Sequence, residues 1–279
     1  MTARTFSQVD VFGSGPLSGN PVAVVHDAEG IDDEELAAFA RWTNLSETTF
    51  LLPPTDGRAD YRLRIFTPGA ELPFAGHPTL GSAHAWLEAG GVPRVAGLVV
   101  QECGVGLVDV RQGGEQLAFA APELLRSGPV EQEVLDHVLA ALRIAPDAVL
   151  ASAWVDNGPG WVGVQLAGAE QVLALEPDFV RMRGLDVGVI GAHGDGGPAD
   201  FEVRAFCPDY SIPEDPVTGS LNAGLAVWLT ASGRAPASYT VRQGTALQRS
   251  GDVTVSTDED GRIWVGGACR THVRGTLDL

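Results

Sequence analysis

Two segments of this sequence are apolar on nearly every face of a helix, and they constrain the fold more than any other feature. They are "HPTLGSAHAWLEAGG" at 77–91 and "TGSLNAGLAVWLTASG" at 218–233. A helix that is apolar all round must be enclosed by other parts of the protein. Pro78 suits the first turn of the first helix and Gly90 suits its end. The surrounding segments read mostly as strands, so the simplest packing is a curved sheet wrapped around each helix.

The segments around the two helices form a repeat. Residues 64–73, "RIFTPGAELP", and residues 204–213, "RAFCPDYSIP", share the pattern R-x-F-x-P-x-x-x-[LI]-P without a gap. Beyond this pattern, Gly81-Ser82 aligns with Gly219-Ser220 at a slightly different offset, which indicates a small length change. A gapless match at half the chain length predicts two related lobes.

The expected fold class is α+β, with two pseudo-symmetric lobes that are each a barrel-like curved sheet around a central apolar helix. A chain of 279 residues suits two domains, expected at 1–127 and 128–279, with a C-terminus that can cross back to the first lobe. The cleft between two such lobes is a usual place for a small-molecule site. Other helices are predicted at 32–44 and 130–144, a strand pair at 154–166, and strands at 6–12, 22–26, 48–54, 61–68, 97–103, 104–112, 115–122, 201–208, 239–244, 252–260 and 262–267.

The charge of the chain limits its partners. The formal net charge is −18, from 36 acidic and 18 basic residues. Such a surface repels nucleic acids and anionic membranes, so we expect neither as a partner. A small anionic substrate would need a local positive field to bind.

The cysteines and the termini indicate a cytoplasmic protein. The three cysteines, Cys103, Cys207 and Cys269, are an odd number and form no C-x-x-C motif, so neither a disulfide framework nor a zinc site is predicted. The N-terminus has no long apolar run, so we expect no signal peptide. No apolar run approaches the 18 residues typical of a membrane-spanning helix. We therefore expect a cytoplasmic location and no metal.

The mouths of the two apolar helices are the expected binding site. Gly76 and Gly219 would allow a ligand to approach the backbone, and the first N–H groups of each helix lack partners within the helix. These donors and the partial positive charge of a helix start suit a carboxylate. Arg64 and Arg204, which match in the repeat, could bind anions, but structural pairing is the expected role.

Five polar side chains near these mouths could carry chemistry. His77 could shuttle a proton near neutral pH, or simply cap the helix. Asp215 could orient His77 or a substrate amine or hydroxyl, although Asp is also a good helix cap. Ser220 could donate to a substrate or be a small packing residue, and Glu214 could be a solvated neighbour. Glu47 precedes an apolar strand, where burial would raise its pKa and let it hold and return a proton.

At this point the motifs resemble those of the PhzF-like phenazine-biosynthesis proteins, which share the diaminopimelate epimerase-like fold. The similar segments occur in the order of that family and span the chain. They are "VDVFGSGPLSGNPVAVV" at 9–25, "NLSETTFLL" at 44–52, "FTPGAELPFAGHPTLGSA" at 66–83, "EDPVTGS" at 214–220 and "QGTALQRSGDVTV" at 243–255.

The resemblance implies a cofactor-independent isomerase that moves a proton and is usually a homodimer. It implies that Glu47 carries the proton, that His77 and Asp215 assist as catalytic residues, and that Ser220 contacts the substrate. Backbone N–H groups near Gly76 and Gly219 would hold a carboxylate or carbonyl. The best-known reaction of the family isomerises trans-2,3-dihydro-3-hydroxyanthranilate, so a small carboxylate-bearing substrate, such as a dihydroaromatic acid, is expected.

Two alternatives remain open at this stage. The first is an amino-acid epimerase or racemase, but such enzymes use two cysteines at the helix mouths, and "AGHP" and "DPVTGS" contain none. The second is a non-catalytic homodimer that binds a small acid. A single carboxyl group that removes a proton and returns it on one face of the substrate fits the sequence better than the first alternative.

Overall fold

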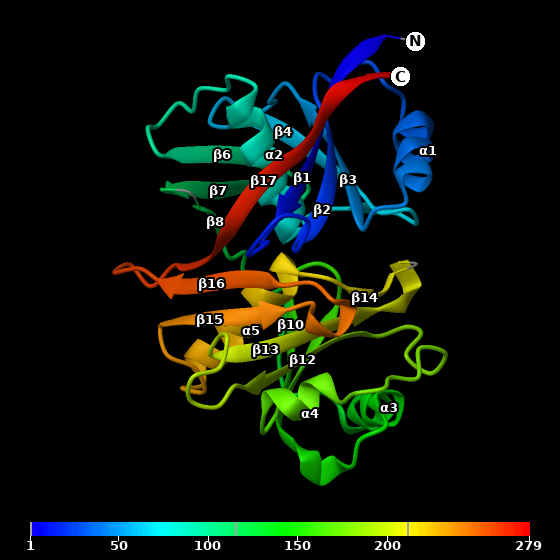
Figure 1. Ribbon diagram of the computed structural model, residues 1–279, viewed down its shortest axis with the longest axis vertical. Helices are drawn as coiled ribbons and strands as arrows, with labels where there is room; N and C mark the ends of the chain where they lie inside the picture. Colours follow the sequence, from blue (N-terminus) through cyan, green and yellow to red (C-terminus); the bar gives the residue numbers. More distant parts are fainter. Residues whose placement is uncertain (1, 115, 211) are drawn as a thin grey trace. The chain divides into compact units, whose positions relative to one another are not determined.

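The computed structural model describes residues 2–114, 116–210 and 212–279 (Figure 1). The chain forms two compact units, Met1–Ala120 with Gly266–Leu279, and Ala121–Val265. The sequence analysis placed the boundary after residue 127, whereas the first unit's main segment ends at Ala120. The C-terminal segment, for which a crossing back to the first lobe was considered, is part of the first unit. Glu115, at the start of an expected strand, and Ser211, inside the repeated pattern, lie outside the described residues.

The first unit is a closed barrel of eight strands. Each strand pairs with the next, and the last pairs with the first, so the barrel has no open edge. In order around the barrel the strands are β1 (Ala3–Val11), β2 (Asn20–Val25), β3 (Glu47–Leu52), β4 (Tyr61–Phe66), β6 (Leu98–Cys103), β7 (Gly106–Gly113), β8 (Gln116–Ala120) and β17 (Ile263–Asp278).

Two parallel strand pairs dictate where the helices of this unit lie. The pairs β2–β3 and β4–β6 are parallel, and a parallel pair needs a long crossover connection. The first crossover is α1 (Asp33–Thr43), capped by Asp32, which accepts the N–H of Glu35 at 2.8 Å. It packs on the outside of the barrel (Figure 1). The second contains β5 (Glu71–Leu72) and α2 (Gly76–Glu88).

Helix α2 fills the inside of the barrel, as its apolar sequence predicts. It contacts β1, β2, β3, β4, β6 and β8, and most of its residues are buried. The helix approaches the strands closely at Gly81, where a Cβ atom would lie 2.3 Å from Val22 Cγ1. Only glycine permits this approach without a shift of the neighbouring valine.

The second unit repeats the order of parallel and antiparallel strand pairs from β1 to β7 in the pairs from β10 to β16. Its pairs β11–β12 and β13–β15 are parallel, and α5 (Gly219–Ala231) follows β13 as α2 follows β4. Helix α5 contacts β10, β11 and β16, and a Cβ at Gly224 would lie 2.2 Å from Val155 O. The remaining elements are β9 (Arg126–Gly128), α3 (Gln132–Leu142), η1 (Pro146–Ala148), β10 (Val149–Asp156), β11 (Trp161–Leu166), α4 (Ala169–Leu173), β12 (Asp186–Ala192), β13 (Phe201–Cys207), η2 (Pro208–Tyr210), β14 (Ile212–Asp215), β15 (Ser238–Gln243), η3 (Thr245–Leu247) and β16 (Gly251–Thr257).

The structure confirms the expected fold class and all four predicted helices. It also contains β12 and the short helix α4, which the sequence analysis did not predict. Strand β12 has the sequence "DVGVIGA", in which two glycines weaken the strand propensity. The final strand runs to Asp278, well beyond the expected end at residue 267.

The alignment of Gly81-Ser82 with Gly219-Ser220 was wrong. Both central helices have 13 residues, and they start at Gly76 and Gly219, so Gly81 lies inside its helix whereas Gly219 begins one. In the sheets, Phe66 pairs with Glu71 and Phe206 pairs with Glu214. The offset between the repeats is therefore 140 at the phenylalanines and 143 at the glutamates and helix starts, which is an insertion of three residues. In this register His77 corresponds to Ser220.

The corrected register reveals a repeated arginine–glutamate pair. Arg64 Nε and Nη2 donate to the two carboxylate oxygens of Glu71, both at 2.7 Å. Arg204 Nε and Nη2 donate to those of Glu214 at 2.9 and 2.8 Å. Each guanidinium also lies over the phenylalanine two residues further on, at 5.0 and 4.9 Å. The expected structural pairing of Arg64 and Arg204 is thus confirmed, and Glu214 is the partner of Arg204 rather than a solvated acid.

The two copies of this arginine–glutamate pair differ in burial, so their contributions to stability can be compared directly. The side chains of Arg204 and Glu214 are 6% and 8% exposed, whereas those of Arg64 and Glu71 are 23% and 42% exposed. Glu214→Gln would leave a buried guanidinium without its counter-charge, so we expect the free energy of unfolding to fall by about 3–5 kcal/mol. Glu71→Gln removes an accessible pair and should cost less than about 1 kcal/mol. Urea unfolding of both variants measures this, and equal losses would contradict the assignment.

Candidate active site

The first unit brings Glu47 and His77 together. Glu47 is the first residue of β3, and His77 is the second residue of α2. The Nε2 atom of His77 lies 3.2 Å from Oε2 of Glu47, and their side chains are 3% and 12% exposed. The pairing depends on the fold, because the enclosed helix and the strand beside it both begin at this end of the barrel. Two of the three predicted catalytic residues therefore form one buried acid–imidazole pair.

Asn20, at the start of β2, sets the protonation pattern of this pair. Its side chain is fully buried, and Nδ2 donates a hydrogen bond to Nδ1 of His77 at 3.3 Å. Because Nδ1 accepts, the neutral imidazole carries its proton on Nε2, the nitrogen that faces Glu47. The sequence analysis did not identify Asn20 as a site residue, although it lies in the "SGNP" part of a family-like segment. A polar residue that begins an apolar strand was the available signal.

Burial keeps the imidazole neutral. It lowers the pKa of His77 to about 3, far below the ordinary value of 6.5. The ring is therefore neutral at neutral pH, with its Nε2 atom 3.2 Å from Oε2 of Glu47, and does not take up a proton there. This favours a positioning role over the proton shuttling that the sequence suggested for His77.

The second unit holds Asp215 in a similar way. Thr218 Oγ1 donates to Oδ2 of Asp215 at 2.6 Å, and Thr218 Oγ1 in turn accepts from Nε2 of Gln243 at 2.9 Å. Gln243 also accepts from Thr218 N at 3.0 Å and from Asn222 Nδ2 at 2.9 Å. Gln243 is fully buried, so its amide fixes the loop between β14 and α5. The sequence analysis identified neither Thr218 nor Gln243 as a site residue.

The hydroxyl group of Ser220 can donate a hydrogen bond to a further acceptor. Its Oγ accepts the indole N–H of Trp161 at 3.1 Å, and its backbone carbonyl accepts from Asn157 Nδ2 at 2.8 Å. Ser220 is 4% exposed and lies in the first turn of α5. Because the oxygen accepts from Trp161, the hydroxyl proton points elsewhere.

Neither central helix is capped by the side chain of its own N-cap residue. The N-cap residues are Ala75 for α2 and Thr218 for α5, and neither makes a side-chain capping hydrogen bond. Pro78 has no N–H, so the first donors of α2 are those of Gly76 and His77. Such donors, with the positive end of the helix dipole, suit a carboxylate or a developing oxyanion.

The three cysteines are placed unfavourably for a two-thiol mechanism. Cys103 lies in β6, Cys207 in β13 and Cys269 in β17, and none is at the start of α2 or α5. Burial raises the pKa of Cys103 and, more strongly, that of Cys269, which opposes the reactive thiolate. All three are free thiols.

No cluster of three or more His, Cys, Asp or Glu side chains could hold a metal ion within residues 2–114, 116–210 and 212–279. Within the same ranges, no helix has the length and apolar character needed to cross a membrane.

Comparisons with known proteins point to one family. The family model described as "Phenazine biosynthesis-like protein" matches residues 9–275. The chain is similar to "Antisense-enhancing sequence 1" of Schizosaccharomyces pombe, with 37% identity over 99% of both chains. It is also similar to "Trans-2,3-dihydro-3-hydroxyanthranilate isomerase" of Pseudomonas fluorescens, with 33% identity over 97% of this chain and 98% of that protein.

Solved structures agree with the fold. A phenazine biosynthesis protein of the PhzF family from Enterococcus faecalis superposes with a TM-score of 0.80 at 26% identity and covers 100% of both chains. A hydroxyproline epimerase from Agrobacterium vitis superposes with a TM-score of 0.60 at 16% identity, over 99% of this chain and 91% of that one. The second likeness concerns the fold alone.

The neutrality of His77 predicts a measurable pH dependence of stability. In the unfolded chain the imidazole takes up a proton below about pH 6.5, whereas the folded protein resists this until about pH 3. The unfolded state therefore binds more protons in this window, and stability is lost as the pH falls. His77→Gln should reduce the slope of unfolding free energy against pH, between pH 4 and 6, by about one proton.

Urea unfolding of the wild type and of His77→Gln at several pH values measures this difference. In parallel, nitrogen NMR of the wild-type imidazole should show a neutral ring with its proton on Nε2 from pH 5 to 8. Identical slopes, or a His77 ring that titrates near pH 6.5, would contradict the assignment.

Proposed function

The chain belongs to the phenazine biosynthesis-like protein family, and from this premise we propose that it is an isomerase in which one carboxyl group, that of Glu47, moves a proton. The relatives named as isomerases support the class of reaction. The observation that carries the assignment of the residue is the buried contact of 3.2 Å between Glu47 and His77.

In the proposed reaction, the Glu47 carboxylate removes a proton from an acidic C–H bond of the substrate. The electron pair of that bond enters a conjugated system, and Glu47, now a neutral acid, returns the proton to another carbon of the same system. No atom or electron is gained or lost, so the product is an isomer. A single group that both accepts and returns the proton acts on one face of the substrate, and the proposal needs no cofactor.

His77 positions the base. Its Nε2–H faces the Glu47 carboxylate because Asn20 occupies Nδ1, and a fixed donor orients one oxygen and leaves the other available to the substrate. A neutral imidazole is suited to this role, because an imidazolium would hold the carboxylate more tightly and weaken it as a base. In this proposal Asn20 orients His77, and His77 orients Glu47.

Asp215 and Ser220 are proposed to recognise polar groups of the substrate. The carboxylate of Asp215, oriented by Thr218, would accept from an amine or hydroxyl, and the Ser220 hydroxyl would donate to a carbonyl or carboxylate. The backbone N–H groups at Gly76 and Gly219 would hold the substrate carboxylate. They would supply the local positive field that a small anion needs against the net charge of −18.

The same proposal includes the remaining expectations. We propose that the protein is a homodimer. We also propose a cytoplasmic location, which the three free thiols support because they suit a reducing compartment. The best-supported substrate class is a small carboxylic acid with an acidic C–H bond. An example is trans-2,3-dihydro-3-hydroxyanthranilate, after which the Pseudomonas fluorescens relative at 33% identity is named.

An amino-acid epimerase is disfavoured by the positions of the cysteines, and alkylation distinguishes it. Iodoacetamide should leave an isomerase based on Glu47 active, whereas a two-thiol enzyme would lose activity. A binding protein without turnover would retain ligand binding and show no proton exchange. Neither alternative is favoured by a specific contact in the described residues.

The decisive experiment follows trans-2,3-dihydro-3-hydroxyanthranilate by proton NMR in D2O. The wild type should convert it, and Glu47→Gln, which keeps the shape but cannot accept a proton, should lower kcat by at least about 10³-fold. Glu34→Gln, an exposed change on α1, is the matched control and should keep full activity.

Each other outcome has a defined meaning. Conversion that survives Glu47→Gln would remove Glu47 as the proton carrier. No conversion by the wild type, together with full binding of the compound, would remove this substrate and direct the search to other small carboxylic acids.

A further inference from the structure

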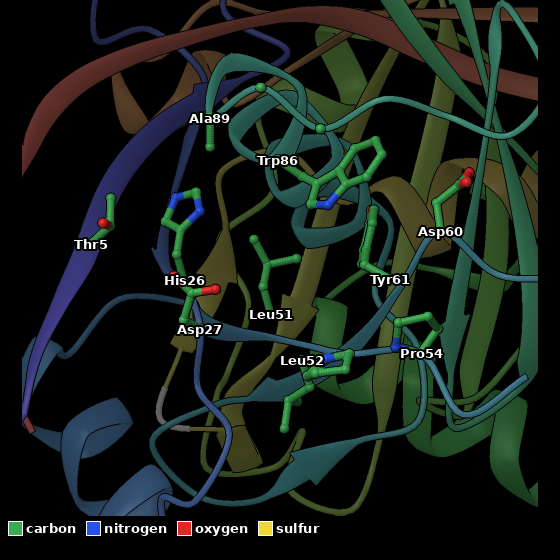
Figure 2. A pocket seen from close by; sticks show the side chains of 13 residues that line it. Thr5, His26, Asp27, Leu51, Leu52, Pro54, Asp60, Tyr61, Trp86 and Ala89 are labelled. Atoms are coloured by element: carbon green, nitrogen blue, oxygen red, sulfur yellow. The ribbon is translucent and has the colours of Figure 1, made fainter.

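A cavity lies at the end of the first barrel that is opposite to Glu47 and His77. It has a volume of about 440 Å³ and is lined by residues at the end of β3, such as Leu51, and by residues at the end of α2, such as Trp86 (Figure 2). Glu47 and His77 lie at the opposite ends of these same two elements. A helix of 13 residues is about 20 Å long, so this cavity is separate from the candidate active site.

The wall of this distal cavity is aromatic and rigid. The Trp86 ring packs against Tyr61 with centroids 5.5 Å apart, and the Tyr61 hydroxyl is fixed by a hydrogen bond of 3.0 Å to Gln101. Gly91 presses on the indole, because a Cβ there would lie 2.3 Å from the ring. Figure 2 shows the Trp86 ring, Leu51 and the His26 imidazole facing the same space. These contacts fix the aromatic wall, which favours a preformed site for a flat apolar group.

The two acidic side chains that line the cavity have no lining cation beside them among the described residues. Asp27 and Asp60 both line it, and neither Lys nor Arg is among the lining residues that the structure describes. Asp60 is buried and accepts two backbone N–H groups, with Arg94 3.9 Å away. Asp27 is exposed, and its carboxylate has no hydrogen bond or ion pair within the described part of the chain, whereas its backbone carbonyl accepts from the Arg4 guanidinium. The carbonyl end of α2 adds a partial negative charge.

His26 does not offset this charge. Its Nε2 is 3.1 Å from Ser7 Oγ, and burial lowers its pKa, which the Asp27 carboxylate offsets only in part. The ring is therefore a neutral polar group at the edge of an acidic, aromatic cavity. The lining carboxylates favour a cation over an anion such as the proposed substrate, and a cation would be attracted by Asp27 and by the face of Trp86.

We propose that the distal cavity is a binding site for a small aromatic amine. Its ring lies between Trp86 and Leu51, and its ammonium group contacts Asp27 and the carbonyl end of α2. The site is independent of the proposed isomerase reaction, since it shares no residue with the Glu47 site and takes a ligand of opposite charge.

Two probes with the same skeleton and opposite charge test this proposal. Phenethylamine and 3-phenylpropanoate are titrated into the whole protein and followed by calorimetry. Saturable binding of phenethylamine is expected, at least about tenfold tighter than that of 3-phenylpropanoate, from the combined cation–π and ion-pair contributions. Equal affinities, or tighter binding of the anion, would overturn the proposal.

Three exposed positions provide variants that leave the fold intact. The Ala89 side chain points into the cavity (Figure 2), so Ala89→Phe should abolish phenethylamine binding by filling it. Asp27→Asn keeps the left-handed backbone at φ 51°, which Asn also tolerates, and should weaken binding about three- to fivefold. Glu29→Gln, a nearby acid outside the cavity, should have no effect.

Unchanged binding to Ala89→Phe would place the amine elsewhere and overturn the proposal. Equal weakening by Asp27→Asn and Glu29→Gln would show general attraction to an acidic surface and would also overturn it. Isomerase activity of these variants should equal that of the wild type, so failure of this proposal and failure of the proposed reaction are distinguishable.

Discussion

The burial of a helix that has no polar face governs the first unit. Because α2 is apolar all round, the strands must close around it, and the barrel does so with two parallel pairs whose crossovers are α1 and α2 itself. Closure places the start of α2 beside the start of β3, and this brings the His77 imidazole to 3.2 Å from the Glu47 carboxylate. The chemistry of the candidate site is therefore a consequence of how the helix is enclosed.

Both units position a carboxylate through a buried amide side chain. In each one, a fully buried amide side chain donates a hydrogen bond to a neutral group that lies against a carboxylate. Thr218 donates a hydrogen bond to Asp215, and His77 contacts Glu47 at 3.2 Å, so the acid is positioned by a neutral partner rather than by an opposite charge. Neutral partners leave the carboxylate basic, which suits a group that must accept and release a proton. The chains are Asn20, His77, Glu47 and Gln243, Thr218, Asp215.

Much of this could be predicted from the sequence, and the failures have physical causes. All-round apolarity predicted the two enclosed helices, and the R-x-F-x-P repeat predicted two related units. The Gly-Ser alignment failed because small residues serve both helix starts and close packing, so only the strand pairing revealed the three inserted residues. Asn20 and Gln243 were missed because a buried amide has no local signature, and its partners come from distant segments. Glu214 was recognised as an acid near a helix mouth, but its partner Arg204 is set by the register of two strands.

The central claim is that one carboxyl group removes the proton and returns it. The most direct test uses a substrate with deuterium at the carbon that loses the proton, in ordinary water, at low conversion. A single-carboxyl mechanism predicts that part of the deuterium appears at the accepting carbon of the same product molecules, because Glu47 carries it between the two positions. A product that contains only solvent hydrogen at the accepting carbon, even in the first turnovers, would contradict this account and require a second acid.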